Sequence, residues 1–113
     1  MLNRSVFIGR ITQEPELRKT KNNEAFVSFT LAVKRDKSDA TDYPDCVAYK
    51  RIAETICKYV QKGDLISVEG KMQTRIKDNK KFTELKVDNM YFTNSKSTEE
   101  KIENSISIPE ETE

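Results

Sequence analysis

The strict alternation of apolar side chains over residues 25–33 constrains the fold of this chain more than any other feature. Every second residue of the segment is apolar and shares one parity: Ala25, Val27, Phe29, Leu31 and Val33. Side chains of a strand point alternately to the two faces of a sheet, so a strand with one buried face has this period of two. The segment therefore predicts a strand with one face in a core.

Two neighbouring segments predict further strands. Residues 6–11 alternate in the same way, with Val6 and Ile8 on one face, and the proline four residues further on ends pairing in the loop that follows. Residues 42–49 form a less regular strand, and Pro44 within it favours an edge or a bulge. Both segments extend the predicted sheet.

A helical pattern follows the third predicted strand. Apolar residues recur at a spacing of three to four residues from Ile52 to Val60, which is typical of a helix with one buried face. The pattern predicts a helix of about three turns. Gly63 is the expected C-terminal cap, because glycine adopts the left-handed conformation that ends many helices.

Two more alternating segments complete the predicted fold. Residues 66–72 and 82–92 flank a polar segment with three lysines and predict a hairpin with a basic tip. A slip in phase after Val87 predicts a bulge near Asp88 and Asn89. The order of three strands, one helix and two strands is that of an oligonucleotide-binding (OB) barrel, an all-β fold of five strands.

The charge of the chain is divided unevenly at Ser95, where the apolar alternation stops. Residues 1–94 carry 18 Lys and Arg against 13 Asp and Glu, whereas residues 95–113 carry two Lys against six Glu. A basic body suits a polyanion because neutralised phosphates release counterions, although ordinary solvation explains the same charges. We expect an OB domain over residues 1–94 and a disordered acidic tail over residues 95–113.

Residues that support catalysis or metal binding are scarce. The chain has no histidine, and its two cysteines, Cys46 and Cys57, are too few for a typical zinc site. It contains no phosphate loop, nucleophile elbow or paired-carboxylate motif. We therefore expect no enzyme, no metal and no cofactor. Without a long apolar stretch or a signal-like N-terminus, the expected location is the cytoplasm, with no membrane partner.

Binding of a single nucleic-acid strand requires cations that follow the phosphates and flat rings on which bases stack. Tyr43 and Tyr49 share parity in the third predicted strand, which allows both rings to stand on one face. Packing of either ring in the core is the alternative. The candidate nucleic-acid-binding residues are Arg4, Lys34, Arg35, Tyr43, Tyr49, Arg51, Lys71, Arg75 and Lys77.

Several sequence blocks occur in the order typical of one family. They are residues 2–4, 6–11, 14–18, 29–33, 53–54, 59–65 and 68–75. On these blocks, residues 1 to about 94 resemble the bacterial and phage single-stranded-DNA-binding proteins. The resemblance implies an OB fold, assembly as a homotetramer, and binding of single-stranded DNA with little sequence preference during replication, recombination and repair.

The resemblance also assigns roles to single positions. Tyr43 and Tyr49 stand where relatives carry aromatic residues that stack bases, and Lys37 and Lys77 stand where some relatives carry tryptophan. The resemblance therefore implies binding with more charge and less stacking. The tail lacks the long linker and terminal Pro-Phe of the family, which suits a phage, plasmid or other mobile-element version. An acidic tail of this kind is a candidate contact for replication or repair proteins.

Other functions fit some of the same residues. An OB-fold adaptor of the replication machinery, similar to primosome components, agrees with the absence of tryptophan. RNA binding uses the same stacking and phosphate contacts as DNA binding. A small hydrolase has the least support, because no reactive constellation of side chains is present.

Overall fold

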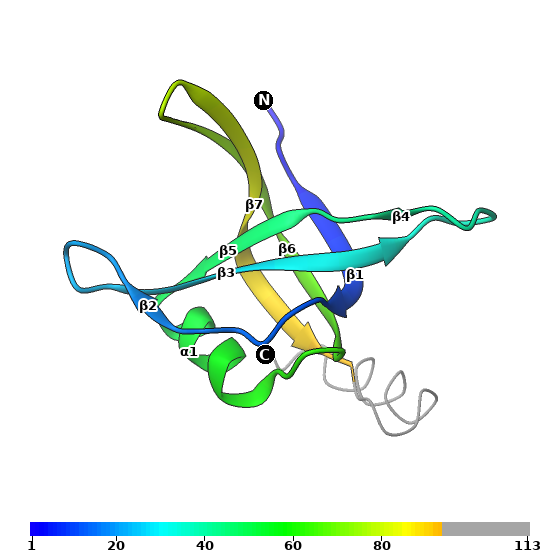
Figure 1. The fold of residues 1–113 in the computed structure, drawn as a ribbon, viewed down its shortest axis with the longest axis horizontal. Coiled ribbons are helices and arrows are strands. Elements are labelled where there is room, and N and C mark those ends of the chain that lie inside the picture. Colours follow the sequence, from blue (N-terminus) through cyan, green and yellow to red (C-terminus); the bar gives the residue numbers. More distant parts are fainter. Residues whose placement is uncertain (94–113) are drawn as a thin grey trace.

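The structure, a computed structural model, describes residues 1–93, so the predicted tail at 95–113 lies outside the described residues. Five long strands build the fold: β1 (Ser5–Ile11), β3 (Ala25–Lys34), β5 (Asp45–Tyr49), β6 (Leu65–Lys77) and β7 (Lys80–Phe92). Two strands of two residues each, β2 (Arg18–Lys19) and β4 (Thr41–Asp42), pair with β3. The helix α1 (Lys50–Tyr59) lies between β5 and β6 (Figure 1).

The five long strands close into a barrel. Their order is β1-β6-β7-β5-β3, and β1 pairs again with β3 through Arg10 and Ile11. The pairing of β5 with β7 is parallel, whereas the other pairings of these five strands are antiparallel. This closed order with one helix after the third long strand is the OB barrel, so the predicted fold class is confirmed.

The buried residues follow the predicted alternation in β3. Its alternate residues Val27, Phe29 and Leu31 are buried in the core, together with Ile56 of α1 and Leu85 of β7. In β1, Phe7 packs against the core and Ile11 belongs to it, whereas the face that carries Val6 and Ile8 is exposed.

The helix ends earlier than the sequence predicts. Val60 is the C-terminal cap, with extended backbone angles of φ −100° and ψ 136°, so the prediction of Gly63 in that role is wrong. The physical reason lies in the loop that follows. Gly63 has a φ of 92°, and its N–H donates to the carbonyl of Ile11 at 2.9 Å, which ties this loop to the end of β1.

The long β6–β7 hairpin carries two of the predicted features. Asp78 and Asn79 form its turn with φ angles of 53° and 63°, as a tight two-residue hairpin turn requires. The register shifts after Glu69, which pairs with Asn89 while the next residue pairs with Val87. The predicted bulge at Asp88 is therefore confirmed.

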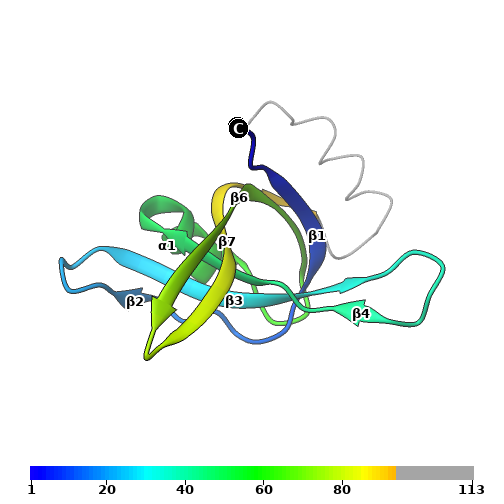
Figure 2. The same cartoon turned by 90° about the horizontal axis from the view of Figure 1, so that it is seen from above.

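Three hairpins project from the barrel in different directions. The β2–β3 hairpin, the β3–β4 hairpin and the β6–β7 hairpin extend to separate sides of the molecule, as the two orthogonal views show (Figures 1 and 2). Loops of this kind surround the surface on which OB barrels bind oligonucleotides.

Candidate nucleic-acid interface

A continuous outward surface spans β3, β5, β7 and β6. Alternate residues of these strands point into the core, so the residues between them point away from it. We call this surface the central face. Its residues are Phe26, Ser28, Thr30, Asp45, Val47, Tyr49, Lys71, Gln73, Glu84 and Lys86, of which Val47 shares the outward parity but is buried.

Tyr49 lies at one end of the central face, where β5 leads into α1. Phe26 of β3 is its cross-strand partner, and the two ring centroids are 6.2 Å apart with planes inclined by 33°. The phenol ring is half-buried. Two rings held in register on neighbouring strands provide a stacking platform whose position the barrel fixes.

A hollow of about 580 Å³ opens beside this platform, and cations line it. Lys50, Arg51 and Lys86 contribute to its wall. Lys50 has a φ of 55°, a left-handed conformation that turns the chain sharply from β5 into α1. Glu24 pairs with Lys50 at 3.8 Å, whereas Arg51 and Lys86 make no ion pair with any residue in the range 1–93.

Register explains why Lys86 joins the hollow. Val47 of β5 pairs with Lys86 of β7, which in turn pairs with Lys71 of β6, so the two lysines lie side by side on the central face. The sequence prediction included Lys71 and missed both Lys86 and Phe26. Phe26 carries a signal that could have been used, because it is the one aromatic side chain on the outward parity of β3.

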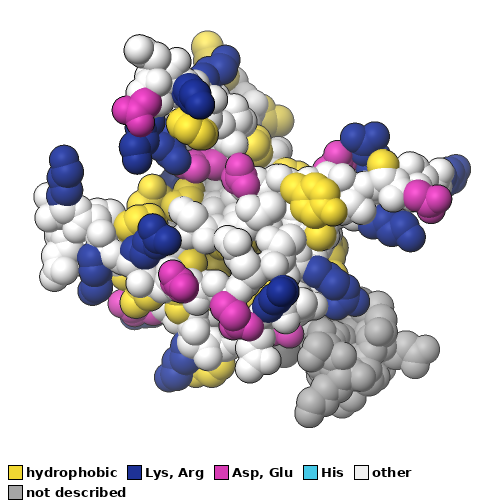
Figure 3. Space-filling model, in the orientation of Figure 1, with side chains coloured by type: hydrophobic (Ala, Val, Ile, Leu, Met, Phe, Trp, Pro, Cys, Tyr) yellow, Lys and Arg dark blue, Asp and Glu magenta, His cyan; other side chains and the backbone are white. Residues whose placement is uncertain are grey.

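The β6–β7 hairpin carries Arg75 and Lys77 beyond the central face. The guanidinium carbon of Arg75 lies 4.8 Å from the ring centroid of Phe82, and its Nε donates to Glu84 at 3.2 Å. Lys77 is opposite Lys80 at the exposed tip. Basic side chains gather on this hairpin in the space-filling view (Figure 3).

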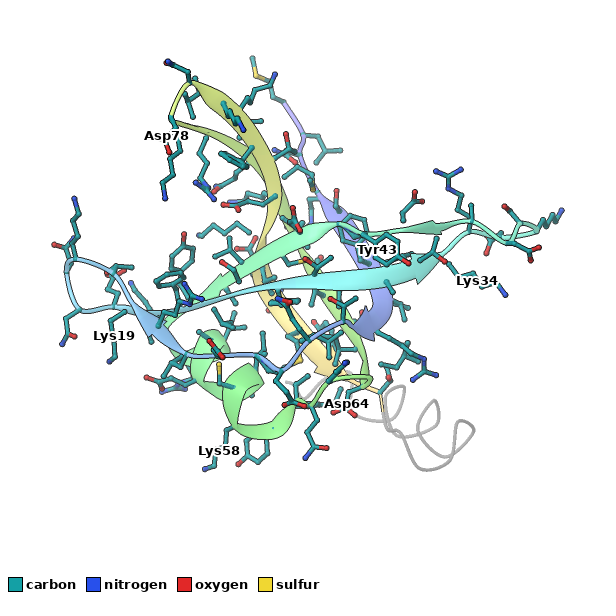
Figure 4. All side chains as sticks on the ribbon, viewed as in Figure 1. Lys19, Lys34, Tyr43, Lys58, Asp64 and Asp78 are labelled. Atoms are coloured by element: carbon teal, nitrogen blue, oxygen red, sulfur yellow. The ribbon has the colours of Figure 1, made fainter. Side chains whose placement is uncertain are left out.

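Tyr43 lies apart from Tyr49. It stands between β4 and β5, where Pro44 interrupts the strand, and the ring is 62% exposed (Figure 4). The predicted continuous third strand is therefore two separate strands. The proline has no N–H for the sheet, but its carbonyl accepts a hydrogen bond from the Leu31 N–H at 3.1 Å.

The β3–β4 hairpin holds Lys34 and Arg35. The guanidinium of Arg35 donates to both carboxylate oxygens of Asp42, with its shortest contact at 2.8 Å. This pairing raises the pKa of Arg35 and lowers the pKa of Asp42. Lys34 forms no ion pair with the described residues 1–93, so it is the freer cation of the two.

Arg4 is separated from the other candidates. It pairs with Glu69 of β6, which also accepts a hydrogen bond from Asn89 at 3.4 Å. Hydrogen bonding to Arg4 lowers the pKa of Glu69. The structure thus brings Tyr49 and Arg51 together at one hollow, and Lys71, Arg75 and Lys77 together on β6, while Arg4 is engaged on the β1 side of the barrel.

Sequence reasoning also missed the cations of the β2–β3 hairpin. Arg18 and Lys19 form the exposed strand β2, and Lys21 follows in the turn. Lys19 points away from the barrel on this hairpin (Figure 4). The basic residues themselves are visible in the sequence. Nothing in the sequence indicates, however, that the β2–β3 turn lies near the end of β5, where Glu24 pairs with Lys50.

Comparison with known proteins finds relatives of this chain. The single-strand binding protein family matches residues 2–93. "Single-stranded DNA-binding protein 1" of Staphylococcus aureus strain MSSA476 is 38% identical over 110 residues, covering 88% of this chain and 70% of the relative. "Single-stranded DNA-binding protein" of Halalkalibacterium halodurans is 45% identical over 84 residues, covering 70% of this chain and 50% of the relative.

A solved structure supports the fold independently. A deletion mutant of the single-stranded DNA binding protein from Thermus aquaticus superimposes with a TM-score of 0.73 at 24% identity, covering 85% of this chain and 43% of that one. The closed barrel, with an aromatic pair on its central face and a cation-lined hollow beside it, defines an OB-fold protein of the nucleic-acid-binding class. The chain belongs to the single-strand binding protein family.

No helix within residues 1–93 is long and apolar enough to cross a lipid bilayer.

Proposed function

We propose that this protein binds single-stranded DNA with little sequence preference, by stacking bases on aromatic rings and by contacting phosphates with Lys and Arg. The observation that carries the proposal is the Phe26–Tyr49 pair at the edge of a hollow lined by Arg51 and Lys86. Rings accept any base because every base has a π face, and cations beside the rings follow the backbone.

The relatives extend the proposal to a cellular role. Their names describe proteins that bind single-stranded DNA. We infer that this protein acts in the cytoplasm, without catalysing a reaction, to cover and protect single strands exposed during replication, recombination and repair. Contact of the acidic segment 95–113 with replication or repair proteins is part of the same proposal.

A titration tests the binding proposal directly. Fluorescent oligo-dT is titrated with the full chain at two salt concentrations, with duplex DNA and oligo-U as competitors. We expect tight binding that weakens as salt rises, because counterion release drives the phosphate contacts. We also expect both competitors to displace oligo-dT poorly. An absence of binding to all three nucleic acids would contradict the proposal and favour a protein adaptor.

We further propose that the protein forms a homotetramer through the exposed apolar face of β1. Val6 and Ile8 are 61% and 56% exposed on this face. Within residues 1–93, β1 pairs with β3 only through Arg10 and Ile11, so the β3-side edge of residues 5–9 has no partner strand. An open edge with exposed apolar side chains is suited to pairing with a second copy of the chain.

The change Ile8→Glu is expected to dissociate this assembly, because it places a charge in an apolar interface. Light scattering coupled to size-exclusion chromatography measures the mass. We expect four chains per particle for the unchanged protein and a smaller particle for Ile8→Glu. Leu17→Glu is the matched control, because Leu17 is an exposed apolar residue in a loop outside β1. Equal masses for all three proteins would contradict this interface.

A further inference from the structure

A second hollow, of about 260 Å³, lies where β3 and β5 meet the foot of the β6–β7 hairpin. Thr30, Asp45, Arg75, Phe82 and Glu84 contribute to its wall. It is distinct from the hollow beside Tyr49, with which it shares no lining residue. Acidic side chains gather at the foot of this hairpin in Figure 3. A binder of polyanions gains nothing from carboxylates that meet phosphates, so their place on the central face requires another explanation.

The two carboxylates offer hydrogen-bond acceptors to the hollow. Thr30 Oγ1 donates to Asp45 Oδ1 at 2.8 Å, and no residue in the range 1–93 donates to Asp45 Oδ2. Glu84 Oε2 accepts from Arg75 Nε at 3.2 Å, and the side chain of Glu84 is only 17% exposed. Asp45 is exposed, whereas Glu84 combines restricted access to water with an Oε1 atom to which no residue in the range 1–93 donates. A half-satisfied carboxylate of this second kind favours a ligand that brings a donor.

The thiol of Cys46 lies near both acidic groups. Burial, followed by the negative charges of Asp45 and Glu84, raises the pKa of Cys46 to about 12. The strand register also places the two acidic residues close together. Cys46 of β5 pairs with Leu85 of β7 in parallel strands, and Asp45 and Glu84 are the residues directly before them. Both carboxylates therefore act on one small region of the surface.

A flat surface borders these acceptors. The ring of Phe82 is 39% exposed, and the guanidinium of Arg75 lies over it. Base–aromatic and base–guanidinium stacking both hold an unpaired base by its face. A base held there presents its edge to the hollow, where the carboxylates stand.

We propose that this hollow selects a base with an exocyclic amino group over thymine. Carboxylates accept a hydrogen bond from the N4 amino group of cytosine, and adenine carries an equivalent donor at N6. Thymine places its O4 carbonyl at the corresponding position, where it meets a second acceptor. The inference rests on the proposed function and adds a base preference at one nucleotide of an otherwise tolerant interface.

Comparing oligo-dC with oligo-dT isolates this effect. Both are pyrimidine strands, so differences in ring size are small, and stacking and backbone flexibility account for most preferences of sequence-tolerant binders. The informative quantity is the ratio of the dissociation constants for oligo-dT and oligo-dC. Each protein variant is compared with the unchanged protein by this ratio, which removes effects common to both strands.

The change Asp45→Asn reverses the hydrogen-bonding character of the site. The hydroxyl of Thr30 continues to donate to Oδ1, which leaves the amide N–H₂ in place of the second carboxylate oxygen. A donor at this position favours the thymine carbonyl. We expect the dT-to-dC ratio to fall about fivefold or more relative to the unchanged protein, in line with the discrimination of a single base contact. Glu84→Gln is expected to lower the ratio in the same direction.

Asp39→Asn is the matched control for charge. Asp39 is exposed in the turn between β3 and β4, outside the hollow, and its change removes the same negative charge. We expect it to alter both affinities equally and to leave the ratio unchanged. An unchanged ratio for Asp45→Asn and Glu84→Gln, with both strands bound, would overturn the base preference alone. Failure of the unchanged protein to bind either strand would instead overturn the proposed function and the preference with it.

Discussion

Replacing Gly70 with alanine is expected to lower the free energy of unfolding by about 3 kcal/mol or more, at the upper end of what overpacking costs. A Cβ at Gly70 would lie 1.9 Å from the carbonyl oxygen of Lys86 and 3.1 Å from the backbone nitrogen of Asp88. Both atoms belong to the backbone of the bulge, so no side-chain rotation relieves the contact. The bulge or the pairing of β6 with β7 must therefore distort.

Urea unfolding followed by circular dichroism measures this loss. Gly63→Ala is the matched control, because Gly63 also has an unusual environment but a Cβ there meets nothing within 4 Å. Its positive φ makes alanine unfavourable by about 1 kcal/mol. We expect Gly70→Ala to unfold at a much lower urea concentration than Gly63→Ala. Equal midpoints for the two variants would show that the bulge tolerates a side chain.

The elements that the sequence predicted well are those in which one local rule acts alone. The strand at β3 follows from alternation, and the bulge at Asp88 follows from a break in that alternation. The end of α1 could not be found in this way. The position of its cap depends on how the chain returns to the barrel. The Gly63 N–H donates to the carbonyl of Ile11 in β1 rather than to a carbonyl of the helix.

The candidate interface shows the same limit. Parity placed Tyr49 on an outward face, but its partner Phe26 and the neighbouring Lys86 come from other strands and depend on the register of pairing. A single sequence contains no direct record of that register. Ion pairs could not be predicted from the sequence either. Arg35 was predicted as a cation available for nucleic acid, but the β3–β4 hairpin places Asp42 beside it.

The change Tyr49→Ala is expected to weaken binding of oligo-dT by about 1 to 3 kcal/mol, the range measured when a base loses its aromatic platform. The ring is half-buried against Phe26 at one end of the central face, beside the hollow that Arg51 and Lys86 line. Removing it leaves the cations in place. We therefore expect affinity to fall while the dependence of affinity on salt stays the same, because the number of phosphate contacts is unchanged.

Two further variants, Tyr49→Phe and Arg51→Ala, separate the contribution of base stacking from the contributions of the Tyr49 hydroxyl and of phosphate contacts. Phenylalanine keeps the ring, so Tyr49→Phe should bind within about twofold of the unchanged protein if stacking is the contribution. Arg51→Ala should weaken binding most at low salt and reduce the salt dependence by about one phosphate contact. Circular dichroism shows whether Tyr49→Ala remains folded. Unchanged affinity in a folded Tyr49→Ala protein would exclude this ring from the interface and shift the binding site toward Phe82 and the β6–β7 hairpin.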